Sequence, residues 1–204
     1  MPEPALADSD GTERNPSADT RRSGPDDDKL RCLDLGCGKA KRAGCVGMDR
    51  YSLPGVDVVH DMKVVPWPFP DRSFDAVYAN HILEHVPDLI QTMEEIHRIL
   101  KLGGRLFVRV PFYRAPGAFQ DPTHVRFFTE RTFEYFTPDG TTSLSPLNYY
   151  SRARFSIGDF EYGWRGLLSW HLDRYVRSRP LRRGFHRMLL HRKSELRLTL
   201  LVVK

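Results

Sequence analysis

Residues 31–38 read Arg-Cys-Leu-Asp-Leu-Gly-Cys-Gly, a short apolar run that ends in an aspartate and a Gly-x-Gly turn. The run predicts a buried strand, and the two glycines predict a tight turn after it. A turn without Cβ atoms lets the backbone approach a bound ligand closely. Taken alone, this stretch is explained equally well by a structural turn between two strands of an α/β core. The surrounding residues are therefore needed to distinguish a ligand-binding turn from a structural one.

A second acidic residue, Asp49, closes the next apolar run at residues 45–48. A glycine turn followed by a carboxylate suits a nucleoside, because the carboxylate can hold the ribose hydroxyls. The dinucleotide fingerprint needs a third glycine and an acidic residue about 20 positions on. Here Asp49 follows Gly36 by thirteen positions, and residues 39–43 contain no glycine. A ligand without a pyrophosphate, such as S-adenosylmethionine, therefore fits better than a dinucleotide.

The composition predicts one globular domain. The chain has 204 residues, and its apolar fraction of 40% is enough for a packed core. It contains no apolar run of membrane-spanning length and no apolar signal core at its start, so we expect a cytoplasmic protein that is not secreted. The three cysteines, Cys32, Cys37 and Cys45, have no zinc-type spacing, and we expect small buried thiols in a reducing compartment.

Charge and polarity separate the first 29 residues from the rest. They contain no aromatic residue and carry eight acidic and four basic side chains, which predicts a disordered tail. The domain is expected over residues 30–204. The whole chain has a net charge of +5, so the domain itself is strongly basic and suits an anionic partner of unspecified kind.

Alternating strands and connections predict an α/β fold with a mostly parallel sheet. After the first two strands, apolar runs predict strands at residues 56–59, 74–79, 105–110, 154–157 and 196–203. Apolar spacing and capping residues predict helices over residues 88–102 and 130–136, a loop over 137–150, and a basic helical insertion over 164–193.

Five blocks of sequence, in this order and spacing, resemble the class I S-adenosylmethionine-dependent methyltransferases, especially their type 11 domains. The blocks are residues 33–38, 47–49, 68–75, 80–86 and 102–106, and the likeness covers residues 31–136. The resemblance implies a Rossmann-like seven-stranded, mostly parallel sheet flanked by helices. Residues 154–157 and 196–203 would form its terminal antiparallel hairpin.

The resemblance also implies S-adenosylmethionine as cofactor and a role for each matching residue. Asp34, Gly36, Cys37 and Gly38 match the motif under the methionine and ribose. Asp49 matches the residue on the ribose hydroxyls, Asp61 and Met62 match the pair at the adenine, and Asn80 and His81 match the segment at the methionine end. The family's usual helix between the first two strands has almost no residues here, which leaves one wall of the cofactor site less covered.

The acceptor side is predicted in residues 121–128, after the fifth strand, where open α/β sheets bind ligands. His124 is our first candidate for a base, Arg126 could bind a carboxylate or phosphate of the acceptor, and Tyr113 is a weaker candidate. The alternative is that Asp121 and Thr123 form a local turn while His124 packs on Phe128. The acceptor is expected to be a small or lipid-like molecule, an anionic one included.

Two other hypotheses compete with this interpretation, and a further prediction concerns the basic segment before the last strand. Residues 81–85 form His-x-x-Glu-His, a zinc peptidase pattern, but Pro87 would break the helix that it needs, so we expect no metal. A binding module that keeps the fold without catalysis is disfavoured by the intact Asp34 and Asp49. Residues 164–193 suit a substrate lid or contact with an anionic membrane. The plain alternative is a solvated basic face. No recognised motif supports nucleic-acid binding.

Overall fold

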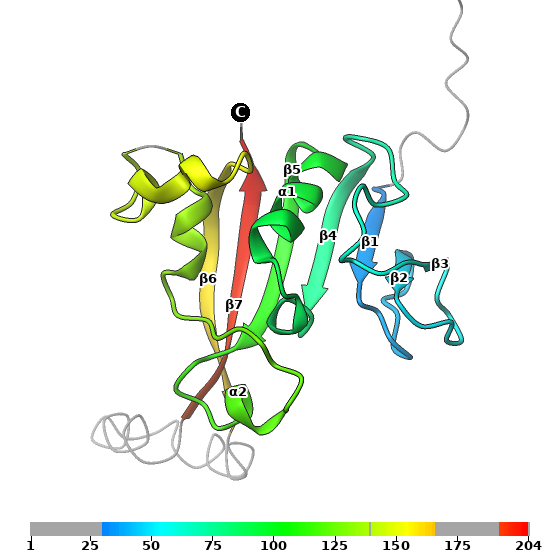
Figure 1. Cartoon of the computed structure of the whole chain (residues 1–204), viewed down its shortest axis with the longest axis horizontal. Coiled ribbons are helices and arrows are strands. Elements are labelled where there is room, and N and C mark those ends of the chain that lie inside the picture. The colour runs from blue at the N-terminus through cyan, green and yellow to red at the C-terminus, as the bar shows by residue number, and fades with distance from the viewer. Residues whose placement is uncertain (1–29, 139, 166–191, 204) are drawn as a thin grey trace, which may run out of the picture.

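The computed structural model describes residues 30–138, 140–165 and 192–203. These form one seven-stranded sheet with the order β3-β2-β1-β4-β5-β7-β6, shown in Figure 1. Its strands are β1 (Cys32–Leu35), β2 (Val46–Asp49), β3 (Val58–Val59), β4 (Phe74–Asn80), β5 (Leu100–Pro111), β6 (Phe155–Arg165) and β7 (Arg192–Val202). Only β7 runs antiparallel to its two neighbours. The predicted seven-stranded, mostly parallel sheet is confirmed.

β1 lies at the centre of the parallel part, between β2 and β4. Leu33 and Leu35 are buried, and Leu33 pairs with Val46 on one side and Val77 on the other. The chain proceeds from β1 outward to β2 and β3, and then returns to place β4 on the opposite side of β1. The strand order reverses at this point, and ligands of open α/β sheets bind at such a reversal, beyond the carboxyl ends of the strands.

Helix α1 (Leu89–Ile99) covers one face of the sheet. Asp88 caps it by accepting a hydrogen bond from the backbone N–H of Gln91 at 2.9 Å, and Met93 and Ile96 are fully buried. The helix ends at Ile99, three residues before the predicted end, because Leu100 already pairs with Phe74 as the first residue of β5.

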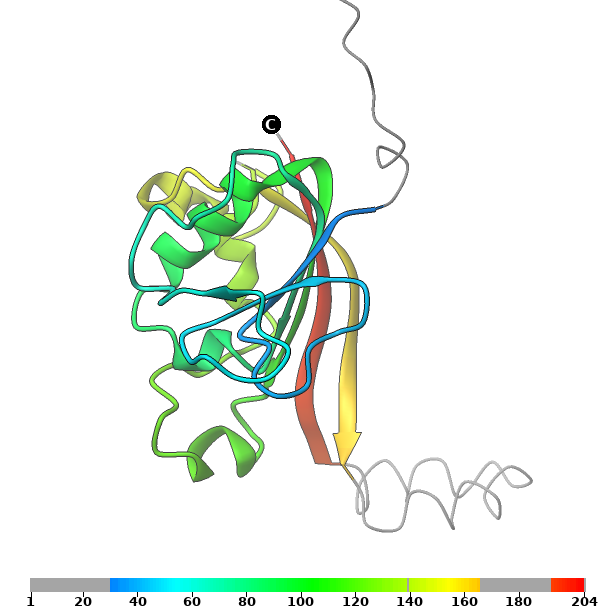
Figure 2. The ribbon, with the colours of Figure 1, turned by 90° about the vertical axis from the view of Figure 1, so that its right-hand side faces the viewer.

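The other described helices are short: η1 (Leu83–His85), α2 (Gly117–Gln120), η2 (Thr132–Phe136) and η3 (Ser145–Tyr150). Figure 2 shows that they lie on the same side of the sheet as α1. As predicted, the chain passes from β1 to β2 without a helix. No helix among the described residues is long and apolar enough to cross a membrane.

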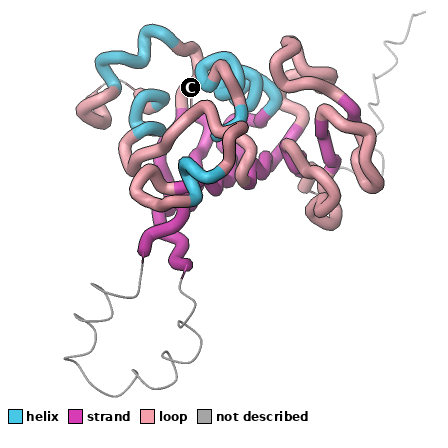
Figure 3. Tube along the Cα trace, turned by 60° about the horizontal axis from the view of Figure 1, so that its bottom comes forward, coloured by secondary structure: helices cyan, strands magenta, loops and turns pink. Residues whose placement is uncertain are grey.

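The terminal hairpin is longer than predicted. β6 and β7 each have 11 residues, and their pairing extends to Trp164 opposite Lys193 and Arg165 opposite Arg192. The predicted helical insertion over residues 164–193 is therefore wrong at both ends, because the pairing of β6 with β7 continues through these four residues. Residues 166–191, its middle, lie outside the described residues, as does the predicted tail over 1–29. Figure 3 shows the paired ends of β6 and β7 projecting past the neighbouring loops.

The expectation of three thiols is wrong for two of them. Cys32 forms a disulfide with Cys45, and their Cα atoms are 4.7 Å apart. Since Leu33 pairs with Val46, the parallel register places Cys45 beside Cys32. Cys37 is the free, buried cysteine, as expected.

Candidate active site

The glycine turn after β1 is shaped for close approach. Gly36 and Gly38 have φ angles of 64° and 53°, in the left-handed region that glycine adopts without strain. A Cβ atom on Gly36 would stand 2.4 Å from Cδ1 of Ile82, whereas a Cβ atom on Gly38 would meet nothing within 4 Å. Gly36 thus lets the segment after β4 pack against the turn, and Gly38 faces open space where a ligand can lie.

The two predicted carboxylates hold this turn in place. Asp34 accepts a hydrogen bond from the backbone N–H of Arg42 at 2.7 Å, which closes the segment that replaces the missing helix. Asp49 accepts from the N–H of Gly38 at 2.9 Å and from the N–H of Tyr51 at 3.0 Å. These bonds fix the Asp49 carboxylate at the carboxyl end of β2, and each of its oxygens keeps a second lone pair for a ligand hydroxyl.

Cys37, between the two glycines, is buried and close to both carboxylates. Burial raises the pKa of its thiol above the usual range, and the negative charges of Asp34 and Asp49 raise it further. The thiol therefore stays protonated at neutral pH, so its place in the motif is that of a small apolar side chain.

Asp61 and Met62 line a small cavity of about 100 Å³ beyond β3, together with Ile82 and His85. Asp61 accepts from the backbone N–H of Lys63 at 3.0 Å, and the carbonyl of Met62 accepts from the indole N–H of Trp67 at 3.1 Å. The glycine turn, the Asp49 carboxylate and this cavity are the positions that the family resemblance predicts for the methionine, ribose and adenine parts of S-adenosylmethionine.

The structure separates the next predicted pair, Asn80 and His81. Asn80 ends β4 and lines a cavity with Tyr78 and Arg109, apart from the residues just described. His81 has a φ angle of 52°, which is unusual for a residue other than glycine. The turn at His81 directs its side chain into a larger cavity.

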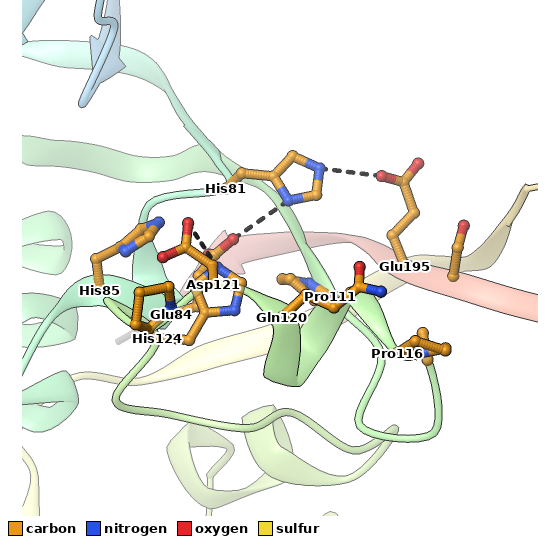
Figure 4. A pocket seen from close by; sticks show the side chains of 13 residues that line it. His81, Glu84, His85, Pro111, Pro116, Gln120, Asp121, His124 and Glu195 are labelled. Atoms are coloured by element: carbon orange, nitrogen blue, oxygen red, sulfur yellow. Dashed lines mark hydrogen bonds and ion pairs between the residues drawn. The ribbon is translucent and has the colours of Figure 1, made fainter.

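This larger cavity has a volume of about 800 Å³ and lies beside the carboxyl ends of β4 and β5. Figure 4 shows His81, Glu84, His85 and His124 gathered at it, with Glu195 of β7 across from them. His85 also lines the smaller cavity described above, so the two cavities share a wall.

His81 lies between two carboxylates. Its Nδ1 is 3.2 Å from Oε1 of Glu84, and its Nε2 is 3.1 Å from Oε2 of Glu195. The hydrogen bond to Glu84 raises the pKa of His81 above its usual range, against the opposing effect of burial, and Glu195 adds to the rise. A protonated His81 donates to both carboxylates, so it orients them and is a poor base.

Glu195 is charged because arginines surround it. Its Oε1 accepts from Arg109 at 2.8 Å and from Nε of Arg197 at 2.6 Å. Although burial favours the neutral acid, these hydrogen bonds hold the pKa of Glu195 below its usual range. Gly163 of β6 leaves the space that this side chain occupies, since a Cβ atom there would stand 2.1 Å from Cγ of Glu195.

His124 reaches the cavity from the loop after α2. Its Nδ1 donates to the carbonyl of Ala118 at 2.9 Å, and its ring packs edge-on against His85 with 4.8 Å between the centroids. Asp121 and Thr123 form the predicted turn, in which Oδ1 of Asp121 accepts from the N–H of Thr123 at 2.8 Å. The local turn is therefore present, and His124 still lines the cavity. Phe128, which the alternative predicted as the packing partner of His124, stacks on Phe133.

The other two acceptor-side candidates do not line this cavity. Arg126 donates from Nε to the carbonyl of Val86 at 2.8 Å and from Nη2 to the carbonyl of Pro87. It joins the His124 loop to the segment that carries Glu84 and His85. The hydroxyl of Tyr113 accepts from Nε of Arg114 at 2.8 Å.

A family comparison agrees with this geometry. The family model of the methyltransferase domain matches residues 10–138, more than half of the chain. The chain belongs to the methyltransferase domain family. It is a class I methyltransferase in fold, and S-adenosylmethionine is its cofactor.

Two curated relatives match parts of the methyltransferase. The sterol 4-C-methyltransferase strm-1 of Caenorhabditis elegans is 30% identical over 105 residues, which cover 40% of this chain and 31% of that one. A demethylmenaquinone methyltransferase of Listeria welshimeri is 43% identical over 54 residues, 26% of this chain and 22% of that one. The match thus spans a third or less of each relative.

Solved structures share the fold over most of their length. The YcgJ protein of Bacillus subtilis gives a TM-score of 0.53 at 16% identity, covering 86% of this chain and 92% of that one. A methyltransferase dependent on S-adenosylmethionine from Archaeoglobus fulgidus gives 0.52 at 17% identity, with coverages of 84% and 86%. The [4+2]-cyclase SpnF gives 0.51 at 20% identity, with coverages of 85% and 75%. The last shows that this fold also serves chemistry other than methyl transfer.

The sequence alone did not predict some of the residues that line the large cavity. Glu195 lies 114 positions after His81, in an alternating strand where no local pattern marks it as functional. Glu84 and His85 belong to the resemblance block over residues 80–86 and to the zinc peptidase pattern, but neither assigns them to the acceptor side. The structure brings these two close to His124 and holds His81 between Glu84 and Glu195.

Proposed function

We propose that this methyltransferase transfers a methyl group to a small-molecule or lipid-like acceptor that binds in the cavity lined by His81, Glu84, His85 and His124. The observation that carries the proposal is the shared wall between the two cavities, formed by His85. An acceptor in the larger cavity would lie next to a cofactor that spans the glycine turn and the smaller one. A volume of about 800 Å³ suits a drug-sized molecule.

S-adenosylmethionine, when bound, supplies a methyl group on a positively charged sulfur whose departure needs no acid. The protein's main contribution is therefore to hold the acceptor atom in line with that methyl group. His81 and Glu195 lie at the cavity wall, and Arg109 and Arg197, which line the separate cavity with Asn80, hold Glu195 in place. These groups suit an acceptor with polar substituents near the reacting atom.

A hydroxyl or amine acceptor also has to lose a proton. His124 is the best-placed base, because its Nδ1–H is held by the carbonyl of Ala118 and its Nε2 keeps a lone pair. Oδ2 of Asp121 lies 3.8 Å from this Nε2 and would stabilise the imidazolium that forms. His81 is less suitable, since both of its ring nitrogens face carboxylates, which raise its pKa above the usual range.

The named relatives support the same class of acceptor. One acts on a sterol and the other on a demethylmenaquinone, as their names state. Both molecules are mostly apolar and carry oxygen substituents on a ring, which is the reason for including lipid-like acceptors. Contact of residues 164–193 with an anionic membrane and a cytoplasmic location stay predictions.

Labelled S-adenosylmethionine incubated with the full chain and a cell extract tests the proposal. We expect the label in a low-molecular-weight or lipid fraction, whose mass increases by one methyl group. Label in protein or nucleic acid would contradict the acceptor class. Tight binding of S-adenosylmethionine without any labelled product, in extracts from several growth conditions, would instead favour a use of the fold other than methyl transfer.

A further inference from the structure

We propose that Glu84, His85 and His124 form a binding site for one divalent transition-metal ion of the zinc type, in the wall of the acceptor cavity. One ligand atom from each of the three lies within 4.8 Å of the other two. Two imidazoles and one carboxylate are a ligand set that zinc and related ions use in proteins, with a further position left for a substrate.

The hydrogen bonds of the two histidines fix which nitrogen is free. The hydroxyl of Thr123 donates its proton to Oδ1 of Asp121 at 2.6 Å, so toward Nδ1 of His85, 2.9 Å away, it can only accept. Nδ1 of His85 therefore carries the proton, and Nδ1 of His124 does so as well because it faces the carbonyl of Ala118. Both rings present Nε2 lone pairs, and such a hydrogen bond on the opposite nitrogen is the usual support of a metal-binding histidine.

Glu84 supplies the independent observation. Its side chain is 1% exposed, Oε1 accepts from His81, and Oε2 is buried without a hydrogen-bond partner among the described residues. A buried carboxylate oxygen with no donor is destabilising, and an ion is one of the few groups that would explain it. The three residues thus offer ligand atoms that lie close together, and the hydrogen bonds above leave Oε2 of Glu84 and the two Nε2 atoms available for a cation.

The backbone holds the three residues near one another before any ion binds. The N–H groups of Val125 and Arg126 donate to the carbonyl of Glu84 at 2.9 and 3.2 Å. The guanidinium of Arg126 adds bonds to the carbonyls of Val86 and Pro87. The loop with His124 is thereby fixed to η1, so little reorganisation is needed. Ligand atoms on one zinc ion stand about 3.3 Å apart, given bonds of about 2.0–2.1 Å, a separation that side-chain rotation can reach.

The use of the ion rests on the proposed function. An acceptor hydroxyl that coordinates the open position loses its proton more easily, because the cation stabilises the oxyanion. The proton would go to water or to the exposed Asp121 carboxylate, and the oxygen would keep its electron pair for the methyl group. The ion competes with a proton for Nε2 of His124, so coordination takes the place of base catalysis by that residue.

This site differs from the peptidase pattern in residues 81–85. The pattern requires His81 and His85 as ligands and Glu84 as a base. Here both nitrogens of His81 face carboxylates, and Glu84 is a ligand. The two assignments predict different effects of replacing His81 and His124.

Calorimetric titration of the untagged, chelator-treated full chain with Zn²⁺, without cofactor or acceptor, tests the site. We expect one equivalent to bind, with affinity reduced at least about 100-fold in Glu84→Gln, His85→Gln and His124→Gln. His81→Gln should keep one equivalent with a smaller loss. Matched controls are His60→Gln and a triple glutamine variant of His171, His186 and His191, both expected to bind like the wild type.

Co²⁺ provides a second readout that needs no variant. Visible d–d absorption stronger than that of the hydrated ion, without a thiolate charge-transfer band, supports coordination by nitrogen and oxygen. Absence of stoichiometric binding, a thiolate band that assigns the ion to Cys37, or loss of binding only in the control variants would each overturn the site. Methyl transfer that persists in chelator, together with no Zn²⁺ binding, would overturn the site and leave the proposed function intact. One bound equivalent of Zn²⁺ without methyl transfer would support the site and overturn the proposed function.

Discussion

The two ends of the candidate active site are built in different ways. The cofactor end comes mainly from one continuous stretch, residues 32–49, together with the small cavity lined by Asp61 and Met62, and backbone N–H groups hold the carboxylates of that stretch. The acceptor end is assembled from η1, the loop after α2, and the start of β7, through side chains that are far apart in sequence. The first end thus depends on backbone geometry, whereas the second depends on a few side chains, which in the proposed function determine what is accepted.

The largest expected effect is at the cofactor end. Gly36→Ala should lower the free energy of unfolding by about 2–4 kcal/mol and abolish detectable cofactor binding. The new Cβ would overlap the side chain of Ile82, and alanine would have to adopt the left-handed backbone conformation of residue 36. Gly38→Ala is the matched control: it has the same backbone strain without the overlap, so it should cost about 1–2 kcal/mol. Chemical denaturation measures both. Equal losses would mean that contact between Ile82 and the turn is unimportant.

The effect of removing the ribose carboxylate should be smaller and confined to binding. Asp49→Ala should weaken S-adenosylmethionine about ten- to a hundredfold, since a hydrogen bond to a charged group contributes about 1.5–3 kcal/mol. Asp57→Ala is a suitable control, because Asp57 is an exposed carboxylate that pairs with Lys41 beside the same strand. Similar weakening by both variants would point to general electrostatics rather than to a ribose contact.

At the acceptor end, Arg126→Gln should reduce turnover about threefold to tenfold and leave cofactor affinity unchanged. The guanidinium joins the His124 loop to the carbonyls of Val86 and Pro87, so its loss loosens the cavity wall by about 1 kcal/mol. Steady-state kinetics and cofactor titration measure the two effects. A raised Michaelis constant for the acceptor with normal turnover would instead favour the original prediction that Arg126 binds the acceptor.

The smallest effect concerns pH. A folded-state pKa above about 6.5 for His81 means that its carboxylate contacts stabilise the protein below that pH and are lost as pH rises through the raised value. Since the ring is half exposed, we expect no more than about 1 kcal/mol. NMR titration of the His81 ring should give a raised pKa that falls in Glu195→Gln. A pKa at or below the ordinary value would show that the histidine is not held between the carboxylates in solution.

The contrast between the two ends also explains what could be predicted from sequence. The glycine turn, Asp49 and the strand order follow from local patterns and from the resemblance, and the sheet agrees with them. Glu195 could not be predicted, because its partner His81 is 114 positions away. The length of β6 was missed because Gly158 and Gly163 interrupt the apolar alternation, and the Cys32–Cys45 disulfide depends on a register between parallel strands that no local pattern reveals.

Cofactor affinity and turnover, measured side by side for Asp49→Ala and His124→Ala, test the separation of the two ends most directly. Asp49→Ala should lose affinity and recover turnover at saturating S-adenosylmethionine. His124→Ala should bind the cofactor within about threefold of the wild type and lose turnover at least about 100-fold, the size of a lost base or ion ligand. If both variants change the same constant, or if the wild type does not bind S-adenosylmethionine, the assignment of a cofactor end and an acceptor end is wrong.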